Sequence, residues 1–152
     1  MYNFFKISLS KILLSFFAFF IIINCEKNNI DRNPYLNEIK FNYEINLNFP
    51  EFDALRYVGG SKKINQIGLN GVILFNFNGN TFLAWEATCA NHIIKECSEL
   101  YIEGVLAKCS CEDFQYSLAT GQLINPKENI NALFGMLNFQ VFSNGNILRI
   151  TN

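Results

Sequence analysis

Histidine is almost absent from the sequence, which has a single one, His92, in 152 residues. Any site that needs two imidazoles is therefore excluded. An excess of basic residues is also lacking, since 12 Lys and Arg stand against 13 Asp and Glu and no basic patch stands out. This balance argues against nucleic acid as a partner. The length suits one domain and no more, and no internal repeat is present.

The sequence also lacks a long hydrophobic segment, and its one marked apolar run is short. Residues 12–23 are apolar at all but one position and follow a basic stretch that contains Lys6 and Lys11. The run is shorter than the roughly 20 residues that a membrane-spanning helix needs. It is typical of a signal peptide, which we predict over residues 1–24. The alternative is an uncleaved anchor, because residues 7–10 could lengthen the run until it just spans a bilayer.

The end of this run carries a processing motif. Ile22-Ile23-Asn24-Cys25 resembles a lipobox, at which the thiol of bacterial lipoproteins is diacylated and the preceding peptide bond is cut. Two or three acyl chains anchor stably, since each buried CH₂ contributes about 0.8 kcal/mol. We therefore expect lipid on Cys25, a polar tether over residues 25–34, and a domain over residues 35–152. The expected location is the cell envelope, periplasmic or surface-facing, with the N-terminal lipid in a membrane.

Short strands and tight turns dominate the rest of the chain. Apolar and polar residues alternate over residues 41–47, and Asn-Gly turns separate two pairs of apolar segments, which favours β-hairpins. Residues 59–63 are interpreted as a solvated turn. The expected strands cover residues 41–47, 72–77, 81–85, 105–108, 114–118, 137–142 and 147–151, with short helical turns at 53–57 and 93–100. Seven or eight short strands predict an all-β sandwich or barrel.

Four cysteines remain beyond Cys25: Cys89, Cys97, Cys109 and Cys111. An even number in an exported protein favours disulfides, and four cysteines allow three pairings. A bridge from Cys97 to Cys109 or Cys111 closes a loop of roughly a dozen residues and contributes about 3 kcal/mol. The alternatives are an iron–sulfur or zinc site between two cysteine loops, or thiol exchange at Cys109-Ser110-Cys111.

The cysteine segments resemble the two ligand boxes of the Rieske iron–sulfur domain. In that family Cys-x-His and Cys-x-x-His supply two thiolates and two imidazoles to a [2Fe–2S] cluster. Residues 82–91 resemble the strand that leads into the first box, and residues 108–121 resemble the second box with its following strand and Thr-Gly turn. The similarity covers roughly residues 71–152. It implies a Rieske-like β domain with two cysteine-bearing loops.

Only two of the four ligand positions carry the residue type that the family has there. Cys89 and Cys109 match the thiolate positions, whereas Asn91 and Glu112 stand where the two histidines are expected. His92 lies one residue past the first of these. The resemblance therefore implies a domain that has lost its cluster, binds no cofactor or metal, and serves a non-catalytic binding or structural role. The alternative is a Rieske-type [2Fe–2S] electron-transfer protein with altered ligands.

The resemblance also implies a disulfide pairing. In Rieske proteins of cytochrome bc complexes, the position of Cys111 is bridged to a cysteine after the first box, so we expect Cys97–Cys111. Cys89 and Cys109 would face each other across the empty ligand site, where they could close a second bridge.

Three further residues bear on the site. Asp113 replaces the Gly that usually follows the second-box histidine. His92 is interpreted as a solvated side chain in a surface loop, and Trp85 as a core residue.

Overall fold

The computed structural model describes residues 33–127 and 133–152. The predicted signal peptide, Cys25 and most of the predicted tether lie outside the described residues. Residues 33–152 form one compact unit. Among the described residues, no helix is both long enough and apolar enough to cross a lipid bilayer.

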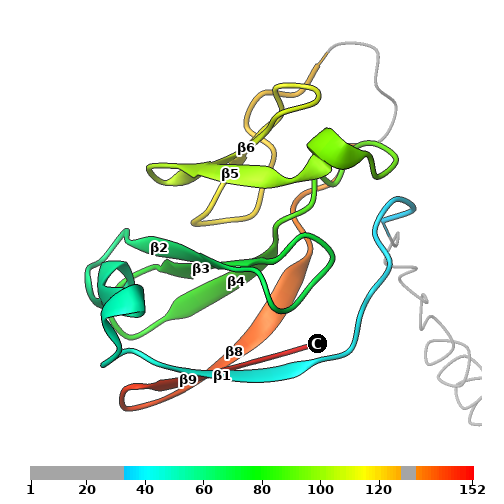
Figure 1. Cartoon of the computed structure of the whole chain (residues 1–152). Coiled ribbons are helices and arrows are strands. Elements are labelled where there is room, and N and C mark those ends of the chain that lie inside the picture. Colours follow the sequence, from blue (N-terminus) through cyan, green and yellow to red (C-terminus); the bar gives the residue numbers. More distant parts are fainter. Residues whose placement is uncertain (1–32, 128–132) are drawn as a thin grey trace, which may run out of the picture. The chain divides into compact units, whose positions relative to one another are not determined.

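A curled, six-stranded antiparallel sheet forms the larger part of this unit (Figure 1). One hairpin joins β3 (Val72–Asn76) to β4 (Phe82–Glu86) across the Asn78-Gly79 turn, and a second joins β8 (Asn138–Asn144) to β9 (Ile147–Thr151). The Asn78 side chain accepts hydrogen bonds from the Asn80 and Thr81 N–H groups, which closes the first turn. In spatial order the strands are β1 (Asn42–Asn46), β9 (Ile147–Thr151), β8 (Asn138–Asn144), β4 (Phe82–Glu86), β3 (Val72–Asn76) and β2 (Ser61–Ile64).

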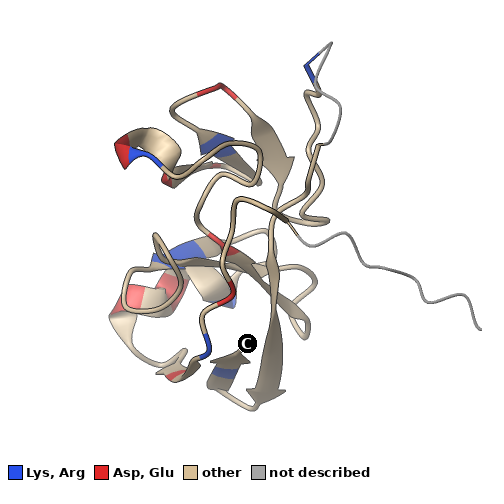
Figure 2. Cartoon of the chain, turned by 90° about the vertical axis from the view of Figure 1, so that its right-hand side faces the viewer, with Lys and Arg blue, Asp and Glu red and all other residues tan. Residues whose placement is uncertain are grey.

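A three-stranded antiparallel sheet carries the cysteine segments. It consists of β5 (Leu100–Glu103), β6 (Leu106–Cys109) and β7 (Gln115–Ser117), with β6 in the middle. Two short 3₁₀ helices complete the described elements, η2 (Pro50–Arg56) and η3 (Glu96–Ser98). Basic and acidic residues are scattered over both sheets (Figure 2), and the pairs Lys63–Glu99 and Lys108–Glu103 are in contact.

Strand β3 separates two hydrophobic cores because it is buried on both faces. Val72 and Leu74 point into the half-barrel core, and Ile73 and Phe75 point into the inter-sheet core. The buried members of the half-barrel core are Ile45, Leu47, Phe52, Leu55, Ile64, Val72, Leu74, Phe82, Ala84, Phe139, Leu148 and Ile150. Those of the inter-sheet core are Leu36, Ile73, Phe75, Trp85, Ala87, Cys89, Ala90, Leu100, Ala107, Cys109, Phe114, Tyr116, Leu118 and Met136.

Trp85 is a core residue, as predicted. Its indole Nε1 donates a 2.8 Å hydrogen bond to the Leu118 carbonyl, so the one polar atom of the ring is satisfied. Gly121 lies against the ring with a φ of 70°, and a Cβ there would come within 2.4 Å of Trp85. The Thr120-Gly121 turn therefore needs glycine both for its conformation and for the approach of the indole.

The expected all-β domain with two cysteine-bearing loops is confirmed, and both predicted hairpins form. Two strands were not predicted. Residues 59–63 are not all a solvated turn, because β2 begins at Ser61 and pairs with β3. The helical turn expected over residues 93–100 is confined to η3, and Leu100 begins β5. Both segments become strands because they pair with neighbouring strands, and their local composition does not indicate this pairing.

Candidate metal centre

The first cysteine-bearing loop runs from the end of β4 to the start of β5. An isolated bridge between Thr88 and Glu99 pins its two ends together. The Cys89 N–H donates to the Ser98 carbonyl at 2.8 Å, and this contact fixes the cysteine just inside the bridge. Residues 90 and 91 form a turn, so successive side chains do not alternate between two faces as they would in a strand.

The second loop is a tight connection between β6 and β7. The Cys109 N–H donates to the Phe114 carbonyl at 2.9 Å, and the Asp113 N–H donates to the Cys109 carbonyl at 3.2 Å. Asp113 adopts a φ of 56°, the left-handed region that favours glycine and tolerates Asp better than most residues. Position 113 therefore has a backbone conformation that suits glycine, although it carries Asp.

A disulfide joins the two loops. Cys97 on η3 is bonded to Cys111, the pair that the resemblance implies. Cys89 and Cys109 are both free thiols and fully buried, so the second bridge that we considered does not form. Because Cys111 is engaged with Cys97, Cys109-Ser110-Cys111 is not a thiol pair available for exchange in this form.

The prediction that His92 is a solvated side chain is wrong. The residue is only 8 % exposed, and its Nε2 lies 3.2 Å from the Cys109 Sγ. On the other side of the ring, Nδ1 lies 2.8 Å from the Ile93 carbonyl oxygen. The turn at residues 90 and 91 brings the ring inward at a position where an extended strand would have pointed it away.

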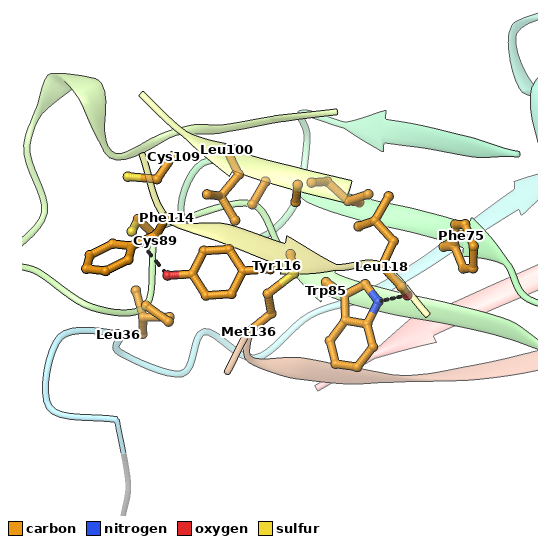
Figure 3. Packing of buried hydrophobic residues seen from close by; sticks show 14 residues of the cluster. Leu36, Phe75, Trp85, Cys89, Leu100, Cys109, Phe114, Tyr116, Leu118 and Met136 are labelled. Carbon is orange, nitrogen blue, oxygen red and sulfur yellow. Dashed lines mark hydrogen bonds between the residues drawn. The ribbon is translucent and has the colours of Figure 1, made fainter. Parts of the chain in front are cut away.

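Three potential ligand atoms therefore converge at one end of the inter-sheet core. The sulfurs of Cys89 and Cys109 and a ring nitrogen of His92 all lie within 4.8 Å of one another, and all three residues are buried. Figure 3 shows both cysteines at this end of the core, with the Tyr116 ring beside Cys89. This convergence overturns the expectation that no cofactor or metal site forms.

Asn91, at the expected position of the first histidine, uses its side chain for hydrogen bonds to other protein groups. Its amide nitrogen donates to the Tyr116 hydroxyl at 2.9 Å and to the Phe134 carbonyl at 2.8 Å. Its amide oxygen accepts from the Phe134 N–H at 2.7 Å. The side chain therefore fastens the segment before β8 to the first loop and orients the Tyr116 phenol.

Glu112, at the expected position of the second histidine, does not join the three converging donors. Its side chain is 39 % exposed, and its carboxylate lies 3.8 Å from the Lys127 ammonium. It is a solvated charge at the loop tip, paired with Lys127.

The two thiols are electrostatically unequal. Donation from the Cys89 thiol lowers the pKa of Cys109 to about 5, against the opposing effect of burial, and His92 and the Glu112 and Cys111 N–H groups add to the lowering. The same thiol–thiol hydrogen bond and burial raise the pKa of Cys89. Cys109 is therefore the first of the two to become a thiolate.

Tyr116 completes the surroundings of Cys89. Its hydroxyl lies 3.3 Å from the Cys89 Sγ and accepts from Asn91, which leaves its own proton free to point at the sulfur. Burial, followed by the contact with Cys89, raises the pKa of Tyr116, so the phenol stays protonated and can act as a donor.

The full donor set of a Rieske cluster does not form from the described residues. Two irons bridged by sulfide take two protein donors each, four in all. The described residues bring together two sulfurs and one imidazole, because Asn91 and Glu112 are engaged elsewhere. The site suits thiolate-binding metals, but in a ligand set different from the one the family uses.

No protein-family model matches this chain, and no curated protein matches it. Among solved structures, it is similar to a chain of the complex of reduced oxygenase and oxidized ferredoxin in carbazole 1,9a-dioxygenase, at 19% identity. That likeness covers 62% of this chain and 82% of the other, with a TM-score of 0.43. It is also similar to a Sphingomonas yanoikuyae B1 ferredoxin (14% identity, 63% and 88% covered, TM-score 0.43). A third is the carbazole 1,9a-dioxygenase ferredoxin of Nocardioides aromaticivorans IC177 (10% identity, 62% and 86% covered, TM-score 0.40).

The observed architecture agrees with the fold that the cysteine segments predict. Both thiol positions lie in loops of a small β domain, and a disulfide ties these loops together. His92 is a ligand candidate that the sequence does not single out. Cys89-Ala90-Asn91-His92 has a Cys-x-x-His spacing, one residue longer than the first box of the family, and only the turn at residues 90 and 91 brings the ring to the sulfurs.

Proposed function

We propose that this domain binds a redox-active metal centre between its two cysteine loops and serves as an electron-transfer protein of the cell envelope. It keeps the electron-transfer role of the alternative that the sequence left open, a Rieske-type [2Fe–2S] protein with altered ligands, and leaves the kind of metal centre open. The observation that supports it is the convergence of the Cys89, Cys109 and His92 donor atoms in a buried site. A metal bound there would supply one-electron chemistry, and the chain would supply its ligands and its insulation from water.

Two features of the surroundings favour a centre that changes its charge. Backbone N–H groups of Asn91, Cys111 and Glu112 donate to the two sulfurs, and such donors stabilise negative charge on a metal-bound thiolate. The disulfide holds the loops in place from outside the site, so the donors need little rearrangement when the charge changes.

The test is the redox behaviour of the protein expressed with its own N-terminal segment and purified without oxygen or chelators. We expect bound metal and a reversible one-electron wave in voltammetry. Cys109→Ser removes a ligand and should abolish the wave. Glu112→Gln is the matched control, because it alters a neighbouring exposed side chain that binds no metal in this proposal. A wild-type protein with no redox-active metal would rule out electron transfer.

Membrane attachment is the second part of the proposal. The signal-like run and the Ile22-Ile23-Asn24-Cys25 motif support lipid on Cys25, with the domain outside the cytoplasm, facing the periplasm or the cell surface. Labelled fatty acid should be incorporated into the wild type and lost in Cys25→Ser. Loss of label with continued retention in the membrane fraction would indicate the uncleaved anchor instead.

A further inference from the structure

The spacing of the three donors carries a more specific inference, which rests on the metal site of the proposed function. We propose that Cys89, His92 and Cys109 bind a single divalent transition-metal ion, whose fourth position none of the other described residues fills. The site would then differ in nuclearity from the [2Fe–2S] cluster that the fold resemblance suggests.

The distances fit one ion. Metal–sulfur bonds of about 2.3 Å and metal–nitrogen bonds of about 2.0–2.1 Å place two donors of one tetrahedral ion about 3.5–3.8 Å apart. The three donor atoms lie within 4.8 Å of one another, and the Cys109 Sγ and His92 Nε2 are 3.2 Å apart. Donors on different irons of a cluster lie farther apart, because two metals and the bridging sulfides separate them.

The imidazole is already in the tautomer that a ligand needs. The Ile93 carbonyl can only accept a hydrogen bond, so the nearby Nδ1 carries a proton. In the neutral ring, Nε2 is then the nitrogen with the free lone pair, and it is the one that faces Cys109. A backbone carbonyl that holds the far nitrogen of a ligating histidine is the usual support for such a site.

Charge balance selects a divalent ion. Two thiolates and a neutral imidazole carry two negative charges, and a divalent ion makes the buried set neutral, whereas unbalanced buried charge is costly. The charges of Glu112 and Lys127 cancel each other at the loop tip, so this pair does not change the net charge of the site. Mixed thiolate and imidazole donors suit iron(II) or zinc, and oxygen-preferring ions such as magnesium are disfavoured.

Metal and sulfide analysis of the protein expressed with its own N-terminal segment tests the inference. We expect one iron per chain and no inorganic sulfide, since the proposed electron transfer needs a redox-active ion. Two irons with two sulfides would overturn the single ion and leave the electron-transfer proposal intact. One zinc would support the single ion and overturn electron transfer, and the absence of any metal would overturn both.

Cobalt(II) added to the metal-free protein tests the ligands directly. The absorption of a tetrahedral thiolate complex should rise to a plateau at one equivalent. His92→Gln and Cys89→Ser should each weaken binding by at least tenfold, and Glu112→Gln should bind as the wild type does. Circular dichroism identifies a variant that fails to fold, and His92→Cys, which restores a donor, should then recover binding. Equal binding by the wild type and folded His92→Gln would contradict the inference.

Discussion

The two hydrophobic cores lie on opposite faces of the same strand, β3, yet they differ in chemistry. The buried members of the half-barrel core are all aliphatic or aromatic hydrocarbons. The inter-sheet core buries two thiols, a phenol and an indole among its apolar side chains, and each of these polar atoms has a partner. One core therefore serves stability alone, and the other combines packing with a site.

The difference shows which of the two cores can accommodate groups that ionise. Buried groups that can ionise destabilise a fold unless they are hydrogen-bonded or bound to metal. The half-barrel core carries the packing that a domain of this size needs, so the inter-sheet core can hold Cys89 and Cys109 at its end. Substitutions in the two cores should then separate stability from metal binding.

The largest expected loss of stability is in the half-barrel core. Leu148 is fully buried on β9, and Leu148→Ala should lower the free energy of unfolding by about 4 kcal/mol because it leaves a cavity. Urea denaturation measures this, and the folded fraction should still bind one equivalent of cobalt. Loss of cobalt binding by the folded variant would show that the two cores are not separable.

The next effect is that of the disulfide at the edge of the inter-sheet core. Cys97 and Cys111 are 14 residues apart, and their joint replacement by Ala should cost about 3 kcal/mol of stability through the unfolded chain. Cobalt affinity should also fall, since the two loops are no longer tied together. An affinity equal to that of the wild type would show that the β-sheets alone position the donors.

A smaller loss is expected at Asn91. Asn91→Ala leaves the Phe134 N–H and carbonyl without this partner, and should lower stability by about 2 kcal/mol. Metal stoichiometry should remain at one ion, because the residue binds the protein and not the metal. A variant that keeps its stability and loses its metal would instead make Asn91 a ligand.

The smallest effect is expected at Asp113, and it has the opposite sign. Asp113→Gly relieves the left-handed backbone and should raise stability by about 0.5 kcal/mol, after the greater freedom of Gly in the unfolded chain is subtracted. Asp113→Ala keeps the strained backbone and should lower stability. Equal stability of the two variants would indicate that φ is not the limiting feature of this loop.

The sequence predicts those parts of this molecule that depend on local patterns. Asn-Gly turns and alternating residues predict the hairpins. The Cys97–Cys111 pair is implied by the family resemblance, since the residues alone leave three pairings open. The edge strand β2 could not be found this way, because Lys62 and Lys63 acquire strand structure only through pairing with β3.

The position of His92 could not be predicted for a similar reason. Whether residues 90 and 91 form a turn is decided by contacts with Phe134 and Tyr116, which are distant in sequence. A single histidine in the sequence excludes a two-histidine site. The sequence does not reveal that this histidine reaches Cys109.

X-ray absorption at the edge of the bound metal tests the central claim most directly, because it counts the atoms that surround the ion. We predict two sulfur neighbours and one imidazole, with one further light atom and no metal–metal scattering. A first shell made only of oxygen and nitrogen, or one without imidazole, would contradict the assignment of Cys89, His92 and Cys109 as the ligands.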